Sequence, residues 1–198
     1  LDVGCAEGHL AEALTAGGCV VSGIEADAAA ARAARERCAE VWCVDVEDAL
    51  ARAIVPGGYD AVVLADVLEH LRDPWATLTW AASLLRAGGV AVVSIPNAVG
   101  WHARRQVAFG RVPLEEWGTF DRTHLCWFTL DSARRLVRDA GLAIERERFT
   151  PSALPLQGRL PAAVAGSDGL ARLRRALADR LPGLFALQFV LVARRPAG

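Results

Sequence analysis

The 198-residue sequence contains no methionine, no lysine and a single tyrosine. All 22 basic residues are arginine, which excludes every mechanism that needs a catalytic or phosphate-binding lysine. A hydride-transfer site built on a Tyr–Lys pair is excluded for the same reason. Long apolar runs are also missing: the longest, near residues 59–65 and 184–193, have strand length. A bilayer-spanning helix needs roughly 20 apolar residues, so we expect no membrane span.

Charge and cysteine content narrow the class of protein further. The formal net charge is −1, so there is no overall basic excess that would favour a nucleic-acid partner. The five cysteines include no C-x-x-C pair, and this odd number favours reduced thiols in a cytoplasmic protein. Histidines, cysteines and acids show no metal-ligand spacing, so we predict no metal. The sequence does not indicate an oligomeric state.

Apolar and helix-forming segments alternate through the first half of the chain. The expected strands are 1–3, 19–24, 41–44, 61–65 and 90–95, and the expected helices are 8–16, 28–38, 48–54 and 74–85, the last closed by Gly88-Gly89. This alternation predicts βαβ units and a doubly wound α/β fold with a mostly parallel sheet. Because Leu1 reads as the middle of a strand, we expect a truncated N-terminus.

The regular alternation stops after residue 96. Residues 97–123 have no clear period and carry several aromatic side chains, among them Trp101, Trp117 and Phe120. A long insertion after the carboxyl end of a strand is typical of a lid over a site. Beyond it we expect a helix at 131–140, a strand at 143–149, a loop at 150–168, a helix at 169–181 and a strand at 184–194.

Four acids fall at or just after the ends of consecutive expected strands, and a glycine-rich turn, Leu1–Gly8, follows the first. These acids are Asp2, Glu25, Asp45 and Asp66. Ligands of open α/β sheets bind outside those strand ends. A row of carboxylates there suits a ligand that carries hydroxyls, an amine or positive charge, because phosphate would require arginine or bare N–H groups.

Longer motifs resemble the class I S-adenosylmethionine-dependent methyltransferases. They are Leu1–Gly8, Gly23–Asp27, Val44–Glu47, Tyr59–Leu71 (Y-D-A-V-V-L-A-D-V-L-E-H-L) and Leu84–Asn97 (L-L-R-A-G-G-V-A-V-V-S-I-P-N). Phe120–Phe128, followed by Ala140-Gly141-Leu142, is similar to bacterial small-molecule and glycan-cluster methyltransferases related to the ubiquinone-biosynthesis O-methyltransferase. The resemblance implies one domain over 1–198, with a seven-stranded sheet whose last strand is antiparallel. Residues 1–96 form the cofactor half, 97–128 the lid and 129–198 the C-terminal half.

The resemblance also implies how S-adenosylmethionine is bound. Asp2, Gly4 and Gly8 surround its methionine portion, Glu25 takes the ribose hydroxyls, Asp45 and Val46 meet the adenine, and Asp66 and Val67 line the site beneath the sulfonium. One position departs from the family: Ala6 stands where glycine is usual. Its methyl group is tolerated if the backbone there has negative φ.

Methyl transfer to a hydroxyl benefits from a base. His124 is our candidate, because it follows the aromatic lid and histidine titrates near neutrality; the alternative is that it orients the lid. His70 could face the acceptor or form a wall of the site. The expected acceptor is a small molecule or a glycan, methylated at oxygen. Two other functions stay open: a catalytically degenerate binding module, and a nicotinamide-dependent oxidoreductase.

Overall fold

The computed structural model describes residues 1–48, 53–116, 118–155 and 157–197. Its sheet has seven strands in the order β3-β2-β1-β4-β5-β7-β6. They are β1 (Asp2–Val3), β2 (Ser22–Glu25), β3 (Glu40–Cys43), β4 (Tyr59–Ala65), β5 (Leu85–Pro96), β6 (Ala143–Pro151) and β7 (Ala186–Arg194). The first five are parallel, and β7 runs antiparallel between β5 and β6. The doubly wound fold with an antiparallel last strand is therefore confirmed.

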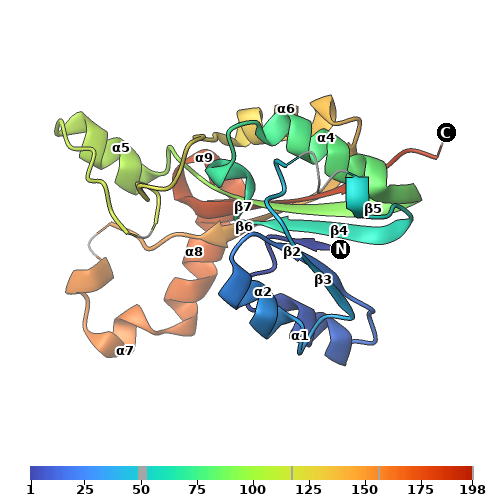
Figure 1. Ribbon diagram of the computed structural model, residues 1–198. Coiled ribbons are helices and arrows are strands. Elements are labelled where there is room, and N and C mark those ends of the chain that lie inside the picture. The colour runs from blue at the N-terminus through green and yellow to red at the C-terminus, as the bar shows by residue number, and fades with distance from the viewer. Residues whose placement is uncertain (49–52, 117, 156, 198) are drawn as a thin grey trace.

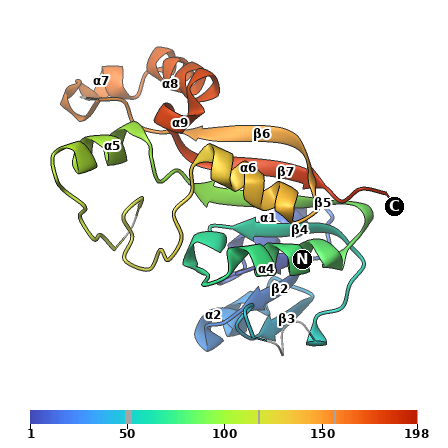
Figure 2. The same cartoon turned by 90° about the horizontal axis from the view of Figure 1, so that it is seen from above.

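Helices cover both faces of this sheet (Figures 1 and 2). Helices α4 (Pro74–Leu84) and α6 (Leu130–Asp139) lie on one face, and α1 (His9–Ala16) and α2 (Ala28–Ala34) lie on the other. Helix α8 (Asp168–Arg180) extends from the β6 end on the α1 side. The remaining helical segments are η1 (Leu68–His70), α5 (Trp101–Ala108), η2 (Gln157–Arg159), α7 (Ala162–Ala165) and α9 (Pro182–Phe185). No helix in the described ranges is long and apolar enough to cross a bilayer.

The two faces of the sheet bury side chains unequally. The larger core joins the sheet to α4 and α6, and its fully buried members include Leu78, Leu136 and Phe189. Under α1 and α2 the packing is a small cluster of Cys5, Ala11, Val21, Ala34 and Cys38. The sheet is therefore packed mainly against the α4–α6 layer.

Several expected boundaries shift for local reasons. Helix α2 ends at Ala34 rather than 38, because the N–H groups of Glu36 and Arg37 turn back to the carbonyls of Ala33 and Ala34 in tighter i→i+3 bonds. Helix α4 ends at Leu84, and Gly88-Gly89 lie inside β5 instead of closing the helix. Gly88 has φ +73°, and the β4–β5 pairing shifts register between Tyr59 and Ala61. The two glycines therefore lie in an irregular part of β5 and do not end a helix.

The region expected to be irregular contains more helix than its sequence suggested. Residues 101–108 of the predicted lid form α5, and the expected loop 150–168 contains η2 and α7. The last strand begins at Ala186, after the short helix α9. The predicted helix 48–54 falls largely on residues 49–52, which lie outside the described residues. Trp117 of the predicted lid also lies outside them.

Candidate functional site

A cavity of about 360 Å³ opens at the carboxyl ends of β1, β2, β3 and β4. Its lining includes Gly4, Glu25, Asp45, Val46, Asp66, Val67 and His70, all of them predicted site residues. Parallel pairing explains the assembly, because Val3 is opposite both Ile24 and Leu64, so the residues that follow these strands emerge side by side. The structure thus gathers residues spread over the first 70 positions at the carboxyl ends of these strands.

The turn after β1 is built for close approach. Gly4 has φ +71°, and a Cβ atom there would lie 2.6 Å from Cγ2 of Val67. Ala6 has φ +45°, so the negative φ under which its methyl group would be tolerated without strain is not present. The left-handed region costs a non-glycine residue roughly 1–2 kcal/mol. The turn therefore holds an alanine in a backbone conformation that favours glycine.

Glu25 holds this turn in place. Its Oε2 accepts a hydrogen bond from the N–H of Ala6 at 2.9 Å, and its Oε1 accepts one from the N–H of Asp27 at 2.8 Å. A carboxylate has about four acceptor positions, so both oxygens keep lone pairs for a ligand. Glu25 thus joins the first loop to the end of β2 and presents an oriented pair of acceptors to the cavity.

Glu47 is a cavity residue that the sequence analysis missed. Its carboxylate accepts hydrogen bonds from the N–H and Nε of Arg72 at 3.1 and 3.2 Å and from the N–H of Asp73 at 2.8 Å. Burial alone would raise the pKa of Glu47, but these hydrogen bonds bring it below its usual value. The side chain ties the loop after β3 to the loop that precedes α4, and so fixes the adjacent Asp45 and Val46.

Asp66 lies where the cavity meets a second one. Its φ is +55°, an unusual value for a residue other than glycine. Nε2 of Gln188 donates to both carboxylate oxygens at 2.9 Å, and Oγ of Ser94 lies 3.3 Å from Oδ1. The backbone conformation and these hydrogen bonds hold the Asp66 carboxylate at the boundary between the two cavities.

The second cavity has a volume of about 520 Å³ and lies beneath the predicted lid. Asp66 and His70 line both cavities. The rest of its lining comprises Glu69, Pro96, Glu116, Gly118, Thr119, Asp121, Thr123, His124, Leu187 and Gln188. Apart from residue 117, which is outside the described ranges, the lid segment 116–124 supplies most of one wall, and no arginine is among these lining residues.

Hydrogen bonding fixes the protonation of the His70 ring. The hydroxyl of Thr123 donates to Oδ1 of Asp121 at 2.6 Å, which uses its only proton. Nδ1 of His70 lies 3.0 Å from that hydroxyl oxygen and 3.3 Å from the carbonyl oxygen of Thr123, and both can only accept. Nδ1 therefore carries a hydrogen, so in the neutral ring Nε2 is the nitrogen with the lone pair.

His124 and Glu69 complete this corner. The His124 ring lies 4.8 Å from the His70 ring, measured between centroids, in an edge-on arrangement. Burial and the neighbouring His70 lower the pKa of His124, partly offset by a hydrogen bond to the Thr119 backbone. Glu69 is 1 % exposed, and burial raises its pKa to about 7. Its Oε2 is buried without a hydrogen-bond partner.

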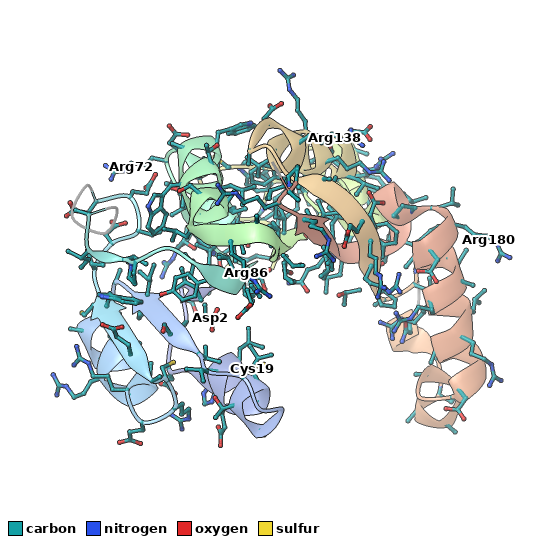
Figure 3. The ribbon with its side chains drawn as sticks, turned by 90° about the vertical axis from the view of Figure 1, so that its right-hand side faces the viewer. Asp2, Cys19, Arg72, Arg86, Arg138 and Arg180 are labelled. Atoms are coloured by element: carbon teal, nitrogen blue, oxygen red, sulfur yellow. The ribbon has the colours of Figure 1, made fainter. Side chains whose placement is uncertain are left out.

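Two predicted site residues lie elsewhere. Asp2 lines a third cavity, on the α1 side of the sheet, together with Leu14, Cys19 and Tyr59. Figure 3 shows Asp2 and Cys19 on that side. Gly8, with φ +82°, is the N-cap of α1, where a Cβ atom would lie 3.2 Å from Cα of Ala34. Contact of either residue with the cofactor stays a prediction.

The residues that sequence reasoning missed are Glu47, Glu69, Asp121, Thr123 and Gln188. Two of them had a visible signal. Glu69 is a charge inside the apolar run of D-V-L-E-H-L, and Gln188 interrupts an otherwise apolar final strand. Asp121 and Thr123 had none, because only the folded lid brings them to His70.

Comparisons with known proteins agree with this geometry. A family model described as a methyltransferase domain matches residues 1–147. The ubiquinone biosynthesis O-methyltransferase of Chromobacterium violaceum is 35% identical over 103 residues, which is 49% of this chain and 44% of that protein. The namesake enzyme of Thiobacillus denitrificans is 39% identical over 101 residues, with the same coverage. The chain thus spans less than half the length of these curated relatives.

Solved structures show the same fold. An S-adenosylmethionine-dependent methyltransferase from Archaeoglobus fulgidus superposes with a TM-score of 0.67 at 16% identity, covering 98% of this chain and 84% of that one. The magnesium protoporphyrin IX methyltransferase of Synechocystis PCC 6803, solved with bound S-adenosylhomocysteine, gives 0.59 at 18% identity, covering 98% and 72%. Fold, family model and the cavity at the strand ends agree, and the chain belongs to the class I S-adenosylmethionine-dependent methyltransferase family.

Proposed function

We propose that this protein transfers a methyl group from S-adenosylmethionine to a hydroxyl oxygen of a small molecule. One observation carries the proposal: Asp66 and His70 line both the cavity at the strand ends and the cavity under the lid. A donor in the first and an acceptor in the second would therefore meet at these two side chains. Positioning is the main requirement of such a transfer, because the reacting atoms must be held close and aligned.

The first cavity has the chemistry that the cofactor needs. Glu25 offers oriented acceptors for the ribose hydroxyls, and Asp45 offers a carboxylate for the adenine amine beside the apolar Val46. Gly4 leaves room for close approach of the methionine portion. When bound, S-adenosylmethionine supplies an activated methyl group. The carboxylate of Asp66, fixed by Gln188, favours positive charge at the boundary of the cavities.

The second cavity favours a neutral, hydroxyl-bearing acceptor. Its lining contains Glu69, Glu116 and Asp121 and, in the described part, no arginine to bind a carboxylate or phosphate. Three arginines of the lid segment are engaged locally: Nε of Arg104 donates to the carbonyl of Val99, Arg105 lies over the ring of Trp101, and Arg122 pairs with Glu116. The rings of His70 and His124 line this cavity, where a neutral imidazole would accept the proton of the acceptor hydroxyl.

The relatives named ubiquinone biosynthesis O-methyltransferases support oxygen as the accepting atom. The test is to incubate the protein with S-adenosylmethionine and panels of phenols, catechols, sugars and amines, and to follow S-adenosylhomocysteine release and the mass of the product. We expect release with hydroxylated acceptors and a product heavier by one methylene. Turnover with amines alone would overturn the assignment to oxygen. Cofactor binding without turnover on any panel would favour the degenerate binding module.

A further inference from the structure

Glu47 joins two loops that reach the first cavity from different strands. It lies after β3 in the loop that carries Asp45 and Val46, the expected adenine-binding residues, and it sits beside that cavity's mouth among its lining residues. Its backbone N–H donates to Oδ1 of Asp45 at 2.9 Å. Its carboxylate accepts hydrogen bonds from the backbone N–H groups of Arg72 and Asp73 at 3.1 and 2.8 Å. One residue thus contacts the adenine loop through its main chain and the segment before α4 through its side chain.

The segment 68–73 that Glu47 holds is also the place where the lid docks. The carbonyl of Glu69 accepts hydrogen bonds from the N–H groups of Leu125 and Cys126 at 2.8 and 2.9 Å. Burial and, after it, the negative charge of Glu47 raise the pKa of the Cys126 thiol, so the Glu47 carboxylate acts directly on the end of the lid. The adenine loop and the lid are therefore joined through this one segment.

We propose that Glu47 is a positioning residue through which cofactor binding orders the lid. The loop after β3 is immobilised when its Asp45 and Val46 hold the adenine. Glu47 transmits this restraint to the segment 68–73, and so to the lid. The lid then loses less conformational entropy when it closes over an acceptor. This inference rests on the proposed binding of S-adenosylmethionine in the first cavity, but not on the identity of the acceptor.

The Glu47 side chain can transmit a restraint because it is itself firmly held. It is 12 % exposed and accepts a third hydrogen bond, from Nε of Arg72 at 3.2 Å. Burial opposes its ionisation, but the hydrogen bonds from Asp73 and Arg72 outweigh burial and keep its pKa below the usual value. Hydrogen bonds to an ionised acceptor are stronger than those between neutral groups. The two backbone donors cannot leave the carboxylate unless the segment itself moves.

The ion pair with Arg72 contributes little to this link. The side chain of Arg72 lies at the surface (Figure 3) and is 77 % exposed. Ion pairs of exposed side chains contribute little, because water and salt screen them. The backbone N–H groups of Arg72 and Asp73 therefore carry the link, and a variant can remove the ion pair without removing them.

The test measures hydrogen exchange by NMR at the amides of Leu125 and Cys126, which are exposed to exchange when the lid leaves Glu69. Glu47→Gln keeps the size of the side chain, but it removes the charge and places an NH₂ group against one N–H donor. We expect these two amides to exchange about tenfold faster in ligand-free Glu47→Gln than in the parent. The amide of Leu136, in the buried core of α6, reports global unfolding and should exchange alike in both.

Two matched variants separate this link from a general loss of charge. Arg72→Ala removes the ion pair but leaves both backbone donors in place. Glu40→Gln removes an exposed charge at the start of β3, outside the two site cavities. In both variants we expect the amides of Leu125 and Cys126 to exchange as in the parent.

Saturating S-adenosylhomocysteine provides the second arm of the test. It should slow lid exchange in the parent by about fivefold or more, and this slowing should be lost in Glu47→Gln. Equal lid exchange in the ligand-free parent and Glu47→Gln, or equal slowing in both, would overturn the proposal. Calorimetry on the same samples reports binding of S-adenosylhomocysteine. A parent that does not bind it refutes the proposed function, whereas one that binds it with no change at the lid refutes only the role of Glu47.

Discussion

Gln188 on the last strand holds Asp66, which follows the fourth strand, with both carboxylate oxygens 2.9 Å from one amide nitrogen. The two residues are 122 positions apart, and the strand β5 lies between their own strands in the sheet. The antiparallel insertion of β7 makes this possible, because it places Gln188 opposite Pro96 at the carboxyl end of β5. A residue of the C-terminal half thus orients a carboxylate of the cofactor half.

Replacement of Gln188 tests this relationship. Gln188→Leu keeps the size of the side chain but frees the Asp66 carboxylate. A hydrogen bond to a charged group is worth about 1.5–3 kcal/mol, so we expect S-adenosylmethionine binding to weaken about tenfold in calorimetry. Gln106→Leu on α5, outside both site cavities, serves as the control and should bind like the parent. Equal affinity in the two variants would mean that Gln188 does not position Asp66 for the cofactor.

Glu25 is the expected ribose ligand. In Glu25→Gln, one acceptor oxygen is replaced by an NH₂ donor, which faces the N–H of Ala6 or of Asp27. The ribose hydroxyls also lose their charged partner. We expect the dissociation constant of S-adenosylmethionine to rise roughly ten- to a hundredfold. Glu7→Gln in the same loop, which is exposed and outside the cavity, is the matched control. Unaltered affinity in Glu25→Gln would remove the ribose assignment.

Ala6 is predicted to reduce stability, because its φ of +45° suits glycine. A non-glycine residue in this conformation costs roughly 1–2 kcal/mol. Glycine avoids that cost, but it lowers stability by up to about 1 kcal/mol because its unfolded chain has more conformational freedom. Ala6→Gly should therefore raise the free energy of unfolding by up to about 1 kcal/mol, measured by urea denaturation. Ala13→Gly, on the exposed face of α1, should lower it by about 1 kcal/mol. A destabilised Ala6→Gly would contradict the left-handed turn.

Asp2 predicts a pH dependence of stability. Burial raises its pKa from 3.8 to about 6, so between these values the folded chain binds more protons than the unfolded chain. The contribution of Asp2 to the free energy of unfolding is therefore greatest below pH 4 and falls as the pH rises to about 6. Asp2→Asn should be more stable than the parent at pH 7, by up to about 3 kcal/mol. Parallel pH profiles of the two proteins would contradict the burial of an ionised Asp2.

The sheet and the first cavity were predictable from sequence because local patterns determine them. Short apolar strands with Glu25, Asp45 and Asp66 at or just after their ends place these acids at one edge of any parallel sheet. The position of β7 was not readable in this way, since alternation of apolar residues gives no partner strand. Gln188 therefore became a site residue only when the strand order was known.

The second cavity depends on tertiary contacts that leave no local pattern. The N–H groups of Leu125 and Cys126 donate to the carbonyl of Glu69, which docks the end of the lid segment against η1. This contact brings Thr123 and His124 to His70 across more than fifty positions. The sequence could not show which nitrogen of His70 carries a hydrogen, because its tautomer depends on Thr123 and on the Asp121 carboxylate that accepts the Thr123 hydroxyl proton.

The cavity between Gly4, Glu25, Asp45 and Asp66 is the site at which we expect S-adenosylmethionine to bind. The most direct test is calorimetric titration of the protein with S-adenosylmethionine and, separately, with NADH. NADH also carries ribose hydroxyls that a carboxylate such as Glu25 could accept hydrogen bonds from. We predict saturable one-to-one binding of S-adenosylmethionine in the micromolar range and none of NADH. A well-folded protein that binds NADH, or neither ligand, would contradict the assignment of this cavity to S-adenosylmethionine.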